Sequence, residues 1–93
     1  MKAVINEIVY DTESAAVLET RTDHEPEDSR HYQEELCQTP EGNFFLHGKG
    51  GRDSWYCKVQ EDGKRGPGEN IIPLSEDQVN AWKTHTFEFH HIF

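Results

Sequence analysis

Histidine and cysteine are the residues with which this chain could hold a metal ion, and it has six histidines and two cysteines. Structural zinc sites usually take their ligands in closely spaced pairs, such as C-x2-C or H-x3-H. Cys37 and Cys57 are instead single and distant, and His90 and His91 are adjacent. Cys37, His47 and Cys57 would come together only if the strands that carry them paired in a suitable register. The spacing therefore predicts no metal site, and we expect no other cofactor.

Covalent catalysis needs a cysteine or serine beside a base, together with a group that orients the base. Cys57 follows Trp55 and Tyr56 in a run that favours a strand, where a cysteine usually behaves as a small buried residue. Carboxylates are numerous, and nothing in their spacing selects two of them as an acid–base pair. The sequence therefore predicts a protein that is not an enzyme.

Gly48, Gly50 and Gly51 form a glycine-rich segment of the kind that can hold a phosphate group. A phosphate-binding loop needs a strand before it and a helix directly after it, and usually ends on a lysine with a serine or threonine. Here a short polar stretch leads into the aromatic run instead. The segment predicts a tight connection between strands, in which glycine takes a positive φ.

The charge of the chain is strongly negative and unevenly distributed. Nine Lys and Arg against 18 Asp and Glu give a formal net charge of −9. This balance argues against direct binding to nucleic acid or to an anionic membrane, both of which need cationic side chains. Between Asp11 and Glu35 there are nine acidic and two basic residues, a net −7; from Leu36 onward there are eight acidic and six basic residues, a net −2.

Concentrated acidity of this kind creates a directional field that selects basic partners. We therefore predict a binding surface for a protein with a basic face, with either Tyr32 or the tail residues Phe87, Phe89 and Phe93 as aromatic anchors. The predicted partner-binding residues are Asp23, Glu25, Glu27, Asp28, Tyr32, Glu34 and Glu35. The alternative is that the charge serves solubility alone, in a generic accessory or regulatory module that could be a homodimer.

The first half of the chain predicts strands around an exposed loop. Residues 4–10 are rich in β-branched side chains and predict one strand that is buried on much of both faces. Residues 15–22 fit a second strand, although their composition also suits a short helix. Residues 23–30 contain Pro26 and no large apolar residue, so they predict an exposed loop. The strongest hairpin signal joins residues 31–38 to residues 43–47 through Pro40 and Gly42.

The second half predicts one more strand at residues 55–59, a polar loop at 61–69 and a C-terminal helix. Ser75 and Gln78 form a capping box, which places the helix from Glu76 to about Lys83. Val79 and Trp82 would face the sheet. Residues 86–93 predict either a final strand or an exposed aromatic tail. We therefore expect one α+β domain over residues 1–93, an antiparallel twisted sheet of four or five strands with one C-terminal helix packed on it.

The compartment follows from the ends and the cysteines of the chain. Met1 to Glu7 reaches a carboxylate too early for a secretory signal, and no apolar run approaches the roughly 18 residues of a transmembrane helix. We expect a cytoplasmic protein, in which two free thiols are the ordinary state. The sequence leaves open whether Cys37 and Cys57 pair.

Several short motifs resemble a group of small proteins carried by bacterial phages and conjugative elements. Their pattern runs roughly Y-D-T-E, E-x-L-Y-x-T, G-x-x-F-L-x-G-x-G-G and I-x-P-L-S, with a tryptophan soon after. The most specific block is matched from Gly42 to Gly51, and Cys37 stands where the pattern has tyrosine. The other matching pieces are Tyr10-Asp11-Thr12-Glu13, Glu34-Glu35-Leu36 and Ile71-Ile72-Pro73-Leu74-Ser75.

This resemblance implies a mobile genetic element, where small acidic proteins often inhibit host defence. It implies a non-catalytic inhibitor of the anti-CRISPR or anti-restriction type, acting in the host bacterial cell. Its partner would be a CRISPR effector or restriction component whose basic surface it occupies. No residue role is carried over, because the group has no assigned activity.

Overall fold

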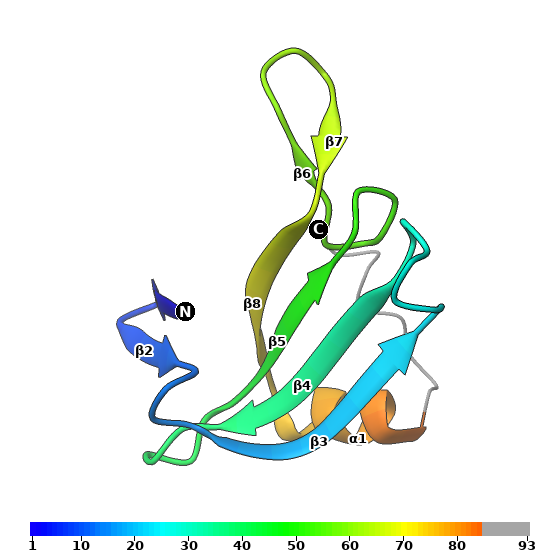
Figure 1. Cartoon of the computed structure of the whole chain (residues 1–93). Helices are drawn as coiled ribbons and strands as arrows, with labels where there is room; N and C mark the ends of the chain where they lie inside the picture. Colours follow the sequence, from blue (N-terminus) through cyan, green and yellow to red (C-terminus); the bar gives the residue numbers. More distant parts are fainter. Residues whose placement is uncertain (85–93) are drawn as a thin grey trace.

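The computed structural model describes residues 1–84, and the centre of the fold is an antiparallel four-stranded sheet in the order β3-β4-β5-β8 (Figure 1). Two hairpins, β1-β2 and β6-β7, form separate two-stranded sheets, and one helix follows β8. The predicted α+β architecture is confirmed. The elements are β1 Lys2–Ile5, β2 Ile8–Asp11, β3 Ala16–Asp23, β4 Tyr32–Gln38, β5 Phe44–Gly50, β6 Lys58–Val59, β7 Arg65–Gly66, β8 Gly68–Leu74 and α1 Glu76–Thr84.

The β4-β5 hairpin forms where the sequence predicts it. Gly42 has a φ of 94°, a left-handed conformation that glycine adopts without a steric cost. The turn closes with the Gly42 N–H donating to the Thr39 carbonyl at 2.9 Å and the Thr39 N–H donating to the Asn43 carbonyl at 2.8 Å. The register places Glu34 opposite Gly48 and Glu35 opposite His47. These two pairs lie on opposite faces of the sheet, because successive side chains of a strand alternate.

The helix α1 packs on one face of the sheet, which we call the helix face. Its core contains Leu36, Leu46, Tyr56, Ile72, Leu74, Val79 and Trp82. The predicted capping box is present: the Gln78 N–H donates to Ser75 Oγ at 3.2 Å, and Gln78 Oε1 accepts from the Ser75 N–H at 2.8 Å. Val79 and Trp82 are buried, as their spacing on a helix predicts.

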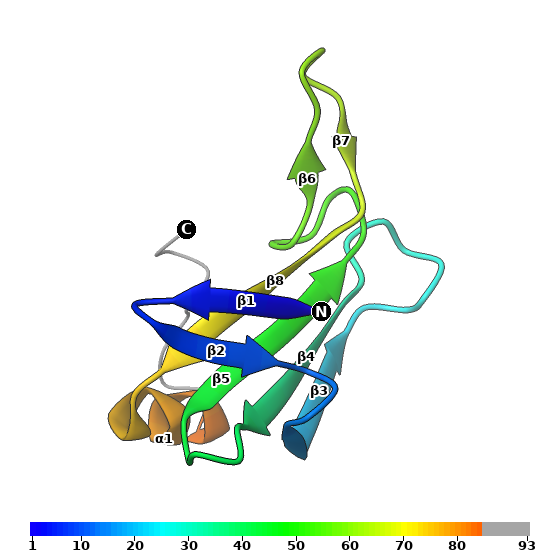
Figure 2. The same ribbon diagram turned by 90° about the vertical axis from the view of Figure 1, so that its left-hand side faces the viewer.

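The opposite face of the sheet is covered in part by the β1-β2 hairpin, which crosses it in Figure 2. Tyr10, Cys37, Phe45 and Ile71 form the core here, and the Tyr10 and Phe45 rings meet edge to face at 5.5 Å. The single strand predicted for residues 4–10 is therefore wrong. Asn6 and Glu7 both take positive φ and turn the chain back on itself. Consecutive positive φ values are typical of a two-residue hairpin turn.

Two other expectations are settled by the structure. Residues 15–22 fall largely within β3, so the strand rather than the helix is correct. The strand predicted at residues 55–59 is reduced to the two residues of β6, and residues 52–56 form turns instead. No helix within residues 1–84 is long and apolar enough to cross a membrane. The predicted tail at 86–93 lies outside the described residues.

Candidate partner-binding surface

The loop from Asp23 to Arg30 is exposed, as predicted, and its second half is fixed to the rest of the fold. Arg30 donates twice to Asp28, from Nε to Oδ1 at 3.0 Å and from Nη2 to Oδ2 at 2.8 Å. This pair lowers the pKa of the Asp28 carboxyl, through the side-chain hydrogen bond first. Ser29 Oγ donates to Asp53 Oδ2 at 2.6 Å, and the Asp53 N–H donates back to the Ser29 carbonyl at 3.0 Å.

Gly51 lets the loop approach this closely. A Cβ on Gly51 would lie 2.3 Å from the Ser29 carbonyl oxygen. The Gly51 N–H also donates to the His31 carbonyl at 2.9 Å. Ser29 and His31 thus join the chain at the end of the loop to the β5–β6 connection at two points.

Glu25 and Glu27 lie in the part of this loop that faces solvent. Neither carboxylate forms an ion pair or a side-chain hydrogen bond with another residue in the 1–84 range. Both residues are exposed, so their carboxylates can meet a cation from outside. Asp23, at the end of β3, is also exposed and accepts a hydrogen bond from the His24 N–H at 2.9 Å.

Glu34 does not belong to this surface, although the sequence predicts it there. Its side chain points to the helix face and only 2% of the residue is exposed. It accepts hydrogen bonds from the Tyr56 hydroxyl and, at 3.1 Å, from Trp82 Nε1. A buried carboxylate requires such donors. The burial of Tyr56 itself, followed by the charge of Glu34, raises the pKa of Tyr56 well above its ordinary value. Glu34 is therefore a structural residue of the core.

Gly48 makes this buried contact possible. It is paired with Glu34 across β4 and β5, and the Tyr56 ring covers it so closely that a Cβ would lie 2.0 Å from Tyr56 Cζ. Gly50 and Gly68, themselves paired, leave room in the same way for Ser54 and for the Tyr56 backbone. The predicted positive φ for the glycines at 48–51 is wrong, because positive φ occurs at Gly42 and Gly63 instead. The absence of a side chain is what these positions need.

Tyr32 stays beside Asp23, its register partner in β3, whereas Glu35 is separated from the loop. Tyr32 is half-buried on the helix face, with its ring 6.2 Å from that of Tyr56. Burial and the Asp23 charge raise the pKa of Tyr32 to about 12. Glu35 lies on the opposite face, where its carboxylate is 3.1 Å from His47 Nδ1. Of the seven predicted residues, the structure groups Asp23, Glu25, Glu27 and Asp28, keeps Tyr32 next to Asp23, and separates Glu34 and Glu35 from them.

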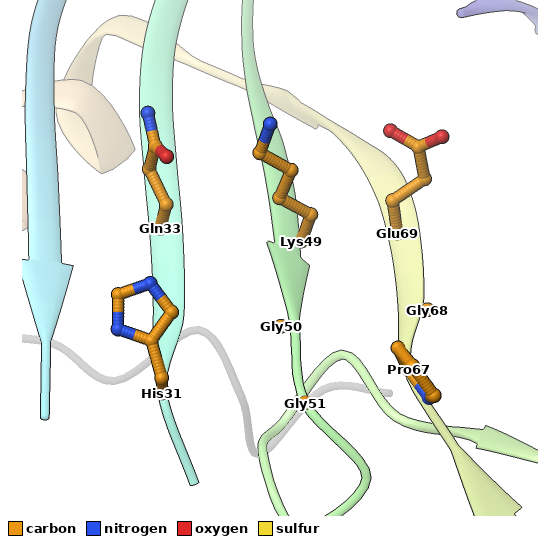
Figure 3. A pocket seen from close by; sticks show the side chains of 8 residues that line it. All are labelled: His31, Gln33, Lys49, Gly50, Gly51, Pro67, Gly68 and Glu69. Carbon is orange, nitrogen blue, oxygen red and sulfur yellow. The ribbon is translucent and has the colours of Figure 1, made fainter. Parts of the chain in front are cut away.

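The uncovered part of the opposite face carries a depression of about 540 Å³. Its polar side chains are Gln33, Lys49 and Glu69, from the neighbouring strands β4, β5 and β8, and His31, just before β4 (Figure 3). Glu69 is hydrogen-bonded to His47, with its Oε2 2.6 Å from His47 Nε2. This hydrogen bond lowers the pKa of Glu69. The depression presents one ammonium beside one carboxylate and has no dominant charge. Gly50 and Gly51 of the glycine-rich segment also line it.

The cysteines and histidines of residues 1–84 do not assemble into a metal site, since no three metal-binding side chains in this range could hold an ion together. Cys37 and Cys57 are free thiols. Cys37 is buried, and burial raises its pKa to about 11, which keeps the thiol protonated and weakly nucleophilic.

Comparisons with known proteins give no family to which the chain can be assigned. No protein-family model, no curated protein and no solved structure matches the chain.

Proposed function

We propose that this protein is a non-catalytic binding module that recognises a basic protein surface through the solvent-facing residues of its acidic loop. The observation that carries the proposal is the pair Glu25 and Glu27, two exposed carboxylates on a loop whose second half is fixed. A loop that is already ordered loses little conformational entropy on binding. Hydrated carboxylates attract a cationic partner and raise the rate of encounter.

The partner class follows from charge and from the resemblance to proteins of mobile genetic elements. A surface that binds nucleic acid is basic, because it must neutralise phosphate groups. An acidic loop that occupies such a surface competes with the nucleic acid. The proposed partner is therefore a nucleic-acid-handling complex of host defence, of the CRISPR or restriction kind, and the proposed effect is inhibition.

Neutralising the two loop carboxylates tests the proposal. The variant Glu25→Gln/Glu27→Gln and the control Glu41→Gln/Glu61→Gln change the net charge equally, and all four positions are exposed. Each is compared with the wild type in titrations against CRISPR effector and restriction complexes purified from the host. We expect the loop variant to bind about tenfold more weakly, with a shallower salt dependence, and the control to bind like the wild type. Equal losses of affinity in both variants would mean that only the net charge of the protein matters, not the position of the two carboxylates, and would contradict the proposal.

A further inference from the structure

Within residues 1–84, β3 is an edge strand of the four-stranded sheet. It pairs with β4 on one side, and no other strand of residues 1–84 lies on its other side (Figure 1). Seven of its eight residues are exposed, and Arg21 is the partly buried one. An edge strand of this length presents backbone N–H and C=O groups that another chain can pair with. The other edge, β8, contacts β1 and contains Pro73, which has no N–H to donate.

A β-bulge limits the part of β3 that can accept a strand. The register with β4 shifts between Val17 and Glu19, so regular pairing runs from Glu19 to Asp23. Before this stretch, Val17 and Leu18 leave 52% and 47% of their surfaces exposed. The edge therefore has an apolar end at the bulge and a regular stretch of five residues after it.

The charges of the regular stretch are arranged for a basic neighbour. Glu19, Arg21 and Asp23 point to the helix face, opposite Leu36, Glu34 and Tyr32. The Arg21 guanidinium is engaged by Trp82, with its central carbon 3.9 Å from the centre of the ring. A neighbouring strand would therefore meet the carboxylates of Glu19 and Asp23. Asp23 leads directly into the loop that carries Glu25 and Glu27.

We propose that β3 binds an extended basic segment of the partner, which adds to the sheet as a fifth strand antiparallel to β3. The proposal rests on the proposed function and names the form that the partner takes. Lys or Arg side chains of the segment lie opposite Asp23 and Glu19, β-branched residues lie opposite Thr22 and Thr20, and aliphatic residues reach the apolar end. Backbone hydrogen bonds supply affinity in this mode of recognition, and the side chains supply selectivity.

A synthetic peptide with the matching pattern, acetyl-Lys-Arg-Lys-Thr-Gln-Thr-Lys-Val-Val-amide, serves as the probe. Its third to seventh residues run antiparallel to β3 from Asp23 to Glu19. Two further peptides carry N-methyl groups at alternate residues. One is methylated at the odd-numbered positions and the other at the even-numbered positions. N-methylation removes backbone donors on one edge and keeps every charge, so the three peptides separate strand pairing from simple attraction.

We expect the unmodified peptide to slow hydrogen exchange of alternate backbone amides between Glu19 and Asp23. One of the two methylated peptides should bind about tenfold more weakly, because it loses the hydrogen bonds to β3. The variant Glu19→Lys should weaken the unmodified peptide by about fivefold. Its control Glu13→Lys, with the same net charge, should bind it like the wild type.

Three outcomes would overturn strand addition. The first is equal binding of all three peptides with protection confined to residues 24–30, which would leave the proposed function standing. The second is that the unmodified peptide does not bind. The proposed function is then still tested by the titration of the Glu25→Gln/Glu27→Gln variant against the purified complexes. The third is that, without any peptide, hydrogen exchange of the β3 amides slows as the protein concentration rises. That result would show that a second copy of this chain pairs with the edge.

Discussion

The guanidinium of Arg21 lies over the ring of Trp82, with its central carbon 3.9 Å from the ring centre, and Arg21 Nη2 also donates to the Trp82 carbonyl. The two residues are 61 positions apart and connect the edge strand β3 to the last turns of α1. Cations near the carboxyl end of a helix stabilise it, because the last carbonyls carry partial negative charge. This contact fixes the end of α1 over the sheet and holds the Arg21 charge away from the open edge.

Removing this contact should loosen the helix. We expect Arg21→Ala to lower the free energy of unfolding by about 1–2 kcal/mol, since both the ring contact and the hydrogen bond are lost. Urea denaturation followed by tryptophan fluorescence measures the change. Arg52→Ala, at an exposed position, is the control and should stay within about 0.5 kcal/mol of the wild type. Matching losses in the two variants would contradict a specific role for Arg21.

The hydroxyl of Tyr56 should stabilise the fold by satisfying Glu34. Tyr56→Phe removes one of the donors to a carboxylate that is 2% exposed, which should cost about 1–3 kcal/mol. Tyr10→Phe removes the hydroxyl of another buried tyrosine, one that packs against Phe45, and should cost much less. Thermal and urea unfolding of both variants measure the difference. A Tyr10→Phe loss as large as that of Tyr56→Phe would show that the Glu34 contact has no special weight.

A methyl group at Gly48 should displace the Tyr56 ring. Gly48→Ala places a Cβ about where ring atoms already lie, 2.0 Å from Tyr56 Cζ, so the ring must move away from Glu34. We expect a loss of about 3 kcal/mol or more, from overpacking and from the weakened hydrogen bond. Gly66→Ala is the control, because its nearest neighbour would be 3.6 Å away, an ordinary contact. A stable Gly48→Ala protein with an unchanged near-ultraviolet spectrum would refute the steric argument.

The pair of Glu69 and His47 should contribute to stability near neutral pH and not in acid. The hydrogen bond from His47 lowers the pKa of Glu69 in the folded state. A carboxyl with a lowered folded-state pKa stabilises the fold above its unfolded pKa of about 4.3, and this stabilisation is lost as the pH falls through the folded value.

Glu69→Gln should therefore be less stable than the wild type at pH 7, by under about 1 kcal/mol because the pair is partly exposed, and the two should converge at low pH. Urea denaturation at pH 7 and pH 3 measures this difference. Glu41→Gln should show the same small difference at both pH values. A Glu69→Gln deficit that persists at pH 3 would mean that the carboxylate charge is not its cause.

The sequence predicts those parts of the fold that local signals determine. The β4-β5 hairpin depends on Pro40 and Gly42, and the start of α1 depends on Ser75 and Gln78, all within a few residues of the element they define. The turn at Asn6 and Glu7 escaped prediction because it lacks the glycine that usually marks such turns. The turns at residues 52–56 depend on Gly48 and Gly68, which belong to other strands.

The candidate site was predicted in part for the same reason. The exposed loop could be found from composition, because Pro26 and a lack of large apolar residues exclude a core position. The burial of Glu34 could not be found this way, since it depends on Tyr56 and on Trp82, which lies 48 positions further along the chain. The alternation of Tyr32, Glu34 and Leu36 on one face of a strand was the one local sign that Glu34 points toward the core.

The attachment of the acidic loop has a consequence for how this protein could change. The loop backbone is held on both sides of Glu27, since the Glu25 carbonyl accepts from the Asp28 N–H at 2.9 Å and the His24 carbonyl lies 3.0 Å from His31 Nδ1. The side chains of Glu25 and Glu27 make none of these contacts. Their charge can therefore be altered by substitution while the sheet, the helix and the loop backbone stay as they are. The loop tip can thus take on a different surface charge without any change in the core of the fold.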